Sequence, residues 1–203
     1  MRRLIPACLA SAVIVLGLAL ASPAWGQSGG GCQLKGSANL SPGLSNNDQN
    51  FTYDFGGDLS GCQSNQAGAP ASGTVEAGKV LTDPATGERF QEPVSAGSGS
   101  CVSSSTNGIA IATWADGTTT VVQYSTTGAL AAVDLTGTVI ASVTLPAINP
   151  LPGQPTSKTI TTTRYAGQSA AGVLAFEPPD PTACSGAGVT AAGIDGFIVL
   201  GSQ

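Results

Sequence analysis

Histidine is absent from the 203-residue sequence, and this absence removes several kinds of catalytic site. Without an imidazole there is no Ser–His or Cys–His nucleophile pair, because the base of either pair is missing. Zinc, copper and non-haem iron sites lose their commonest ligand. The cysteines contain no C-x-x-C pair that would suggest a thiolate zinc site. We therefore expect no metal site and no cofactor, and we assign no catalytic residue.

Charged residues are also scarce, at 9% of the chain against about 25% in an average protein. Most of them are acidic, with twelve Asp and Glu against seven Lys and Arg. Two of the seven basic residues are Arg2 and Arg3 at the N-terminus. An acidic, lysine-poor surface repels phosphate groups, so the composition argues against a nucleic-acid partner and against binding to anionic membranes.

Only one long apolar run is present, and it lies near the N-terminus. It extends from Leu9 to Ala21 and is followed by the small-residue stretch Ala24-Trp25-Gly26. With the basic pair before it, this is the layout of a secretory signal peptide, and the run is short for a membrane span. We expect cleavage before Gln27, although Ala19-Leu20-Ala21 also fits a peptidase site.

Removal of this signal peptide, residues 1–26, would leave one all-β domain over residues 27–203. No other stretch approaches the ~20 apolar residues that a membrane helix needs, so we expect no membrane association after cleavage. The sequence thus predicts a secreted, extracellular protein.

Four cysteines remain in the mature chain, namely Cys32, Cys62, Cys101 and Cys184. An exported chain meets an oxidising environment, which favours two disulfides. Cys32 opens the first expected strand and Cys62 closes the second, so antiparallel pairing would bring them together. Cys101 precedes a central hairpin and Cys184 precedes the final strand. We predict the pairs Cys32–Cys62 and Cys101–Cys184.

Alternation of polar and apolar residues indicates β-strands through most of the chain. It is clear from Gln33 to Leu40 and from Phe51 to Phe55. Asp116-Gly117 lies between two threonine-rich apolar runs and predicts a tight hairpin turn. The longest pattern, from Val133 to Leu145, would place its apolar side chains on one face, with a bend at Gly137. No clean 3.6-residue pattern appears, so we expect little helix.

About nine short strands with frequent turn signals are typical of an all-β fold. Such a fold is either two antiparallel sheets packed face to face or one sheet closed on itself. We prefer the antiparallel β-sandwich, Ig-like or jelly-roll-like, and retain the closed β-barrel as the alternative. Three stretches are expected to form long surface loops: Ser64–Ser72, Asp83–Gly99 and Leu145–Lys158.

Two sets of strand and turn motifs cover most of the mature chain. The first set is Gly31-Cys32, Leu34-x-Gly36, Pro42-Gly43-Leu44, Phe51-x-Tyr53-x-Phe55-x-Gly57 and Cys62. The second set is Cys101, Trp114-Ala-Asp-Gly-Thr, Gly137-Thr-Val, Leu174-Ala-Phe176 and Pro181-x-x-Cys184. Together they resemble a family of small secreted proteins of high-GC Gram-positive bacteria. The resemblance implies export and an all-β domain, and it brings no activity and no site residues.

Aromatic side chains are the candidate binding residues, namely Trp114, Tyr124 and Tyr165. Exposed aromatic faces are a common means of sugar recognition, and Trp114 lies next to a predicted hairpin tip. The same three rings would equally suit core or cross-strand packing. We expect a non-catalytic binding or structural role in the cell envelope or the medium, with a polysaccharide or another exported protein as partner.

Two other functions stay open. A glycoside hydrolase would need two carboxylates facing each other across a cleft. The candidates are Asp54, Asp58, Glu76, Asp116, Asp134, Glu177, Asp180 and Asp195. Asp134 lies within a strand of apolar pattern, where the alternation places it on the solvated face. The second alternative is an extracellular inhibitor or toxin that presents a loop such as Leu145–Lys158.

Overall fold

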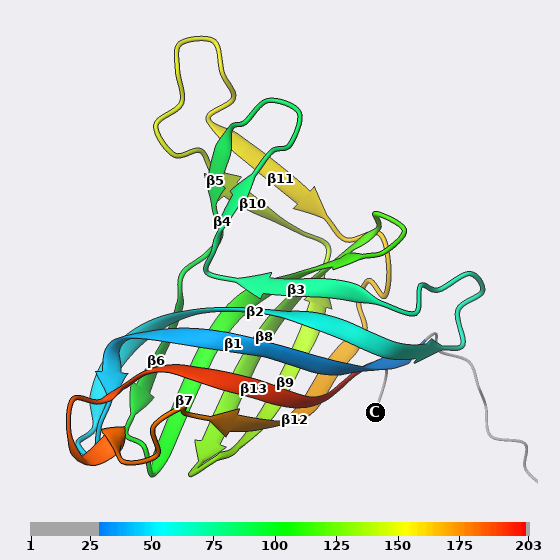
Figure 1. Ribbon diagram of the computed structural model, residues 1–203. Helices are drawn as coiled ribbons and strands as arrows, with labels where there is room; N and C mark the ends of the chain where they lie inside the picture. Colours follow the sequence, from blue (N-terminus) through cyan, green and yellow to red (C-terminus); the bar gives the residue numbers. More distant parts are fainter. Residues whose placement is uncertain (1–28, 202–203) are drawn as a thin grey trace, which may run out of the picture.

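The computed structural model describes residues 29–201, which form thirteen strands and one 3-10 turn (Figure 1). The predicted signal peptide over residues 1–26 and the predicted mature start at Gln27 lie outside the described residues. In the described part of the chain, no helix has the length and apolar character needed to cross a membrane. The prediction of an all-β protein is confirmed.

The main sheet is an antiparallel barrel with eight strand positions. In barrel order the strands are β1 (Gly30–Leu44), β13 (Val189–Leu200), β12 (Ser169–Glu177), β9 (Ala132–Ile140), β8 (Thr119–Ala129), β7 (Ser103–Trp114), β3 (Gly73–Ala77) and β2 (Gln49–Ser64). The sheet closes because β1 pairs with β13 along one edge and with β2 along the other. Leu34 of β1, for example, lies opposite Gly196 on one side and Leu59 on the other.

One position of the barrel wall is divided between two strands. β3 pairs with the later half of β2, whereas β6 (Ser95–Gly99) pairs with its earlier half. Both strands pair with β7 on their other side. Between them, residues 78–94 leave the barrel wall and return to it.

The structure therefore has the closed barrel that was the alternative, rather than the preferred sandwich. Inward and outward side chains alternate in both architectures, so periodicity does not separate them. Closure depends on the length and coiling of β1 and β2, which have 15 and 16 residues. The two strands approach closely where Gly36 pairs with Gly57, and a Cβ on Gly57 would lie 2.7 Å from the carbonyl oxygen of Lys35. Glycine at this point lets the strands coil around the barrel.

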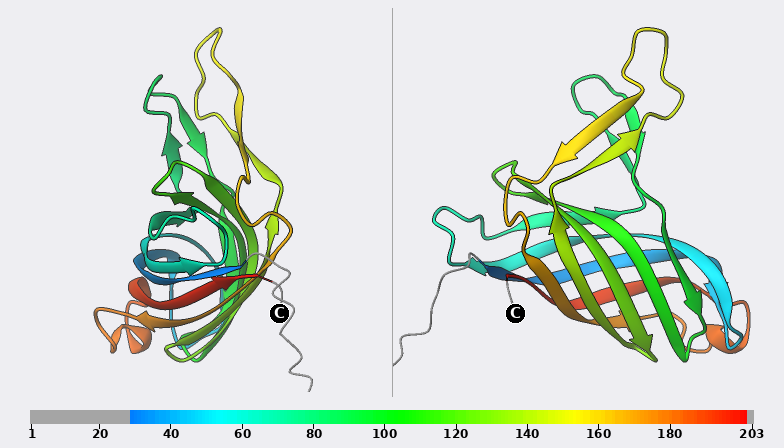
Figure 2. Two further views of the ribbon diagram at one scale, coloured as in Figure 1. Left: turned by 90° about the vertical axis from the view of Figure 1, so that its right-hand side faces the viewer. Right: turned by 180° about the vertical axis from the view of Figure 1, so that it is seen from behind.

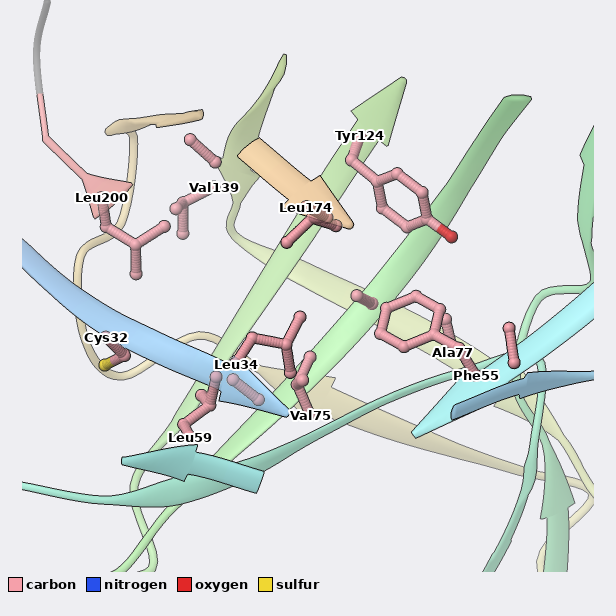
Figure 3. Close-up of a cluster of buried hydrophobic side chains, with 14 of the residues drawn as sticks. Cys32, Leu34, Phe55, Leu59, Val75, Ala77, Tyr124, Val139, Leu174 and Leu200 are labelled. Atoms are coloured by element: carbon pink, nitrogen blue, oxygen red, sulfur yellow. The ribbon is translucent and has the colours of Figure 1, made fainter. Parts of the chain in front are cut away.

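Inward-facing side chains of the barrel strands form the main core (Figure 3). The alternation predicted for the first two strands is confirmed, because Leu34, Ala38, Leu40, Phe51 and Phe55 are all buried.

Two further hairpins project from the barrel (Figure 2). One consists of β4 (Val80–Thr82) and β5 (Arg89–Gln91), the other of β10 (Ser142–Pro146) and β11 (Ser157–Thr161). We call them the double hairpin. A second, smaller core lies between these hairpins and the outer wall of β7 and β8, and it contains Phe90, Ile111, Val121, Val143 and Leu145.

Two of the sequence predictions about the segments in and next to the double hairpin are wrong. The expected single face from Val133 to Leu145 is wrong, because the strand breaks at Ala141 between β9 and β10. The apolar side chains before the break, Val133, Leu135 and Val139, face the barrel interior, whereas Val143 and Leu145 belong to the second core. The predicted loop Asp83–Gly99 likewise contains β5 and β6. A pattern of period two continues through such a change of sheet, so it does not mark the break.

Both predicted disulfides are present. The pair Cys32–Cys62 joins β1 to β2 at one end of the barrel. The pair Cys101–Cys184 joins the turn before β7 to the 3-10 turn η1 (Ala183–Ser185) at the other end. Each end of the barrel therefore has one covalent crosslink.

Candidate functional site

The barrel interior is filled at one end and hollow at the other. At the filled end, next to Cys32–Cys62, the remaining space is about 10 Å³. At the opposite end, next to Cys101–Cys184, there is a cavity of about 340 Å³. Small-molecule sites typically have volumes of roughly 300–1,000 Å³. This cavity is the candidate functional site.

The sizes of the inward-facing residues explain the difference between the two ends. At the filled end the rings of Trp114 and Tyr165 pack edge to face, with centroids 5.8 Å apart. Towards the hollow end, the inward positions of β7 and β8 carry the smaller residues Ser104, Thr106 and Gly128. The hydrogen-bonded ladders fix the radius of a closed barrel, so small inward residues leave a space rather than a collapsed wall.

The cavity wall is mainly apolar. Its largest apolar side chains include Leu40, Phe51, Phe55, Leu135, Phe176 and Ile194. Phe55, Tyr124 and Leu174 line the cavity, whereas Cys32 and Leu200 lie at the filled end; Figure 3 shows the two sets of side chains apart from each other. Of the described residues that line the cavity, none carries a charge. An ion placed here would lose its hydration without gaining a partner, so the wall suits a neutral molecule.

A chain of hydrogen-bonded hydroxyl groups runs along one side of the cavity. The Tyr124 hydroxyl lies 3.1 Å from Ser95 Oγ and 2.7 Å from the Tyr53 hydroxyl. The chain continues from Tyr53 to Thr106 Oγ1 at 2.8 Å and from there to Thr126 Oγ1 at 2.7 Å. Burial is the main cause that raises the pKa of both tyrosines above the ordinary value of 10.0. The whole chain therefore stays protonated and neutral near neutral pH.

The cavity reaches the surface among the turns at its end of the barrel, at the lower left of Figure 1, where the orange turn around η1 lies. Leu130 lines the cavity and is 74% exposed. The backbone N–H of Leu130 donates to the carbonyl of Val102, at 2.9 Å. The N–H of Asn46 donates to the carbonyl of Cys184, at 3.1 Å. These bonds and the Cys101–Cys184 disulfide hold the turns around the opening.

No family model, curated protein or solved structure matches this chain.

The three aromatic residues proposed from the sequence are all buried, with exposures of 4% for Trp114, 3% for Tyr124 and 5% for Tyr165. Trp114 and Tyr165 belong to the filled end, where the indole N–H of Trp114 donates to Thr120 Oγ1 at 2.9 Å. Neither presents a ring face to solvent, so the expected exposed aromatic platform is absent at these positions. Tyr124 lines the cavity and is the one of the three that lies at the candidate site.

The carboxylates considered for hydrolysis do not line the cavity, and the described residues contain no cluster of three or more potential metal ligands. Hydrogen bonds from Thr118, followed by one from Arg164, lower the pKa of Asp116 to about 2. Hydrogen bonds from Thr182 lower the pKa of Asp180. Both groups are stabilised as anions in turns, whereas a general acid needs a raised pKa. Asp134 is exposed, as the alternation indicated.

Glu92 is a buried carboxylate that the sequence did not single out, with 2% of its surface exposed. It lies where residues 78–94 rejoin the wall, and its Oε2 accepts the N–H of Lys79 at 2.9 Å. The N–H of Glu92 in turn donates to the Lys79 carbonyl at 3.0 Å. Burial is the main cause that raises the pKa of Glu92, to about 7. Glu92 thus joins the two ends of the segment 78–94, which connects β3 to β6. It does not line the cavity.

Sequence reasoning missed most of the cavity-lining residues. The alternation identified Phe51, Tyr53 and Phe55 as core, and they are indeed inward, but at the hollow end. Ser104 and Thr106 gave no signal, because residues 103–107 are all polar and show no alternation. Ser104 and Thr106 could have been recognised as inward only by continuing the alternation of β7 from its apolar part, where Ala110 and Ala112 face inward, towards the start of the strand.

Proposed function

We propose that this protein is an exported binding protein that holds one small, neutral, largely apolar molecule inside the barrel. The observation that carries the proposal is the cavity of about 340 Å³ at one end of a closed barrel whose other end is filled. Eight-stranded barrels have an interior just wide enough to be packed with side chains or to hold one small ligand. A cavity of this size in a disulfide-braced barrel favours the second use at this end.

The walls support binding rather than catalysis. The described residues that line the cavity include no carboxylate, lysine or arginine. General acid–base catalysis needs a titratable group within hydrogen-bond reach of the reacting atom. The hydroxyl chain provides hydrogen bonds without a group that titrates near neutral pH, which suits recognition.

The test uses a neutral apolar dye, N-phenyl-1-naphthylamine, whose fluorescence rises in apolar surroundings. We expect a saturable increase with one site per chain. In the Leu135→Trp variant the larger side chain would occupy the cavity, and the affinity for the dye should fall by about tenfold or more, the scale of a strong steric loss. Absence of saturable binding to the wild-type protein would overturn the proposal.

Thr136→Trp is the matched control, because Thr136 is the next residue of β9 and is exposed on the outer face. Its affinity for the dye should equal that of the wild type. Thermal unfolding of both variants distinguishes a filled cavity from a damaged fold. Equal loss of binding in both variants would contradict a ligand inside the barrel.

Export is the second part of the proposal. It is supported by the apolar run from Leu9 to Ala21, by two disulfides in the folded domain and by the resemblance to secreted bacterial proteins. Expression of the full chain in a bacterial host, followed by N-terminal sequencing of the exported product, should identify Gln27 as the first residue. A product that stays in the cytoplasm with its N-terminus intact would overturn export.

A further inference from the structure

The polar groups of the cavity are concentrated on one side. Hydroxyls of Tyr53, Thr106, Tyr124 and Thr126 all line it, and they come from the neighbouring strands β7 and β8 and from β2. Thr106 and Thr126 are direct partners in the β7–β8 ladder. Three further hydroxyls line the cavity in the turn before β7 and at the start of that strand, those of Ser100, Ser103 and Ser104, and the rest of the lining is apolar.

The hydroxyl chain has one more O–H proton than it has hydrogen bonds between its members. Five hydroxyls, from Ser95 to Thr126, are joined by four hydrogen bonds. Each hydroxyl has one proton to donate. Whichever way the bonds run, one O–H of the five does not donate within the chain.

Burial decides where that proton is placed. Ser95 is fully buried and Tyr124 nearly so, whereas Thr126 is half-buried on the cavity wall. An O–H without an acceptor in a buried place is costly, so the chain is favoured to run from Ser95 towards Thr126. In that direction the O–H of Thr126 is the one that donates to no other member of the hydroxyl chain, and it lies on the cavity wall.

We infer that the occupant of the cavity has a neutral oxygen, such as a ketone carbonyl or a hydroxyl, that binds to the Thr126 and Thr106 end of the hydroxyl chain, while its apolar body contacts the opposite wall. This inference rests on the proposed function and specifies its ligand class. Thr126 lies four residues before Leu130 at the opening, about 13 Å along the chain by strand rise. An oxygen at that depth leaves room for an apolar chain between the hydroxyls and the opening.

An anionic head group is disfavoured in the same place. The described lining residues offer no cation, and a carboxylate in apolar surroundings is desolvated, which raises its pKa and weakens its binding in the charged form. A fatty acid should therefore bind poorly at pH 8, where it is charged, and better as the pH falls towards its pKa.

The experiment displaces N-phenyl-1-naphthylamine with four ten-carbon compounds at pH 8: decan-2-one, decan-1-ol, decane and decanoate. The ketone and the alcohol should displace the dye at concentrations about tenfold lower than decanoate, because a charge without a partner is costly to bury. They should also bind more tightly than decane by about threefold to tenfold, the value of one hydrogen bond.

The double variant Thr106→Val, Thr126→Val keeps the shape of both side chains and removes both hydroxyls, because Thr126→Val alone would leave the free O–H on Thr106 at the same end of the chain. It should reduce the affinity for ketone and alcohol by about threefold to tenfold and leave the affinity for decane unchanged. Thr127→Val is the matched control, since Thr127 is the exposed neighbour on β8, and it should change none of the four affinities.

The outcomes separate the two proposals. If the dye binds but all four compounds displace it equally, or if the double variant Thr106→Val, Thr126→Val leaves the preference unchanged, the inferred oxygen site is overturned while the binding function stands. If neither the dye nor any of the compounds binds to the folded protein, the proposed function itself is overturned.

Discussion

The hydroxyl groups of Tyr53 and Tyr124 lie 2.7 Å apart and connect β2 to β8, two strands that are not neighbours in the barrel. The sheet ladders join each strand only to those beside it, so this contact links the wall across the interior. Tyr124 also binds Ser95, which is fully buried. Both side chains line the cavity, so the pair forms part of the cavity wall.

Tyr124→Phe should lower the free energy of unfolding by about 1–3 kcal/mol, because Ser95 would keep a buried hydroxyl without a partner. Tyr53→Phe removes the other member of the pair. If the two hydroxyls act together, the double variant should lose less stability than the sum of the single losses, with a coupling of about 0.5–1.5 kcal/mol. Urea unfolding of the wild type and the three variants measures this cycle. Strictly additive losses would show that the 2.7 Å contact contributes no coupling.

The raised pKa of Glu92 predicts that the protein becomes less stable as the pH rises. Its pKa is raised by burial from 4.5 to about 7, so between these values the folded protein holds more protons than the unfolded chain. The contribution of Glu92 to the free energy of unfolding is therefore fully present below pH 4.5 and is lost as the pH rises from 4.5 to 7. The total loss is about 3 kcal/mol.

Glu92→Gln stays neutral and should remove this dependence. The variant should have a higher free energy of unfolding than the wild type at pH 8, and the advantage should shrink towards pH 4.5. Urea unfolding at both pH values measures it, with Asp58→Asn on the exposed face of β2 as the control. A difference between Glu92→Gln and the wild type that is the same at both pH values would contradict a buried, protonated Glu92.

The two disulfides should differ in their effect on binding. On the loop-entropy model, their removal costs about 3.5 kcal/mol for Cys32–Cys62 and about 4.5 kcal/mol for Cys101–Cys184. The double variant Cys101→Ser, Cys184→Ser should also bind the apolar dye more weakly, because this disulfide holds the turns at the cavity opening.

The double variant Cys32→Ser, Cys62→Ser is its control. This disulfide lies at the filled end, so the variant should be less stable but should bind the dye with unchanged affinity under conditions where it is folded. Chemical unfolding and dye titration of both variants separate the two effects. Weakened binding in the control variant would show that the ends of the barrel are coupled.

Much of the fold could be predicted from the sequence, for identifiable reasons. The strand around Leu34 and the Cys32–Cys62 pair were predictable because alternation and the pairing of consecutive strands are local features, and Cys101 and Cys184 were then the two cysteines left. Closure into a barrel was not, because it depends on β1 pairing with both β2 and β13, and β13 begins at Val189, far along the chain.

The candidate site was harder to predict than the fold. Side chains from seven strands line the cavity, and no single segment records its volume. Tyr124 was proposed as a binding residue on the expectation of an exposed ring, and it lines the cavity as a buried one, while Thr126 was not found at all. Its position in register with Thr106 decides its role, and that register is a contact between strands rather than a pattern within one.

Substitution of Phe90 tests whether the double hairpin is independent of the barrel cavity. Its ring is buried in the second core, beside Leu145 and below the ammonium group of Lys158, which lies 5.7 Å from the ring centroid. Phe90→Ala should cost about 3–5 kcal/mol of local stability, because it leaves a large void among well-packed neighbours.

Hydrogen exchange should then show loss of protection in β4, β5, β10 and β11, while the amides of β1 and β13 stay protected. Affinity for the apolar dye should stay unchanged, since the second core lies outside the barrel wall. Val94→Ala is the control, because Val94 is 60% exposed near the same hairpin and its truncation should change neither measurement. If Phe90→Ala lowered the protection of β1 or the affinity for the dye, the double hairpin would have to contribute to the barrel itself, and the cavity would depend on the two cores packing together.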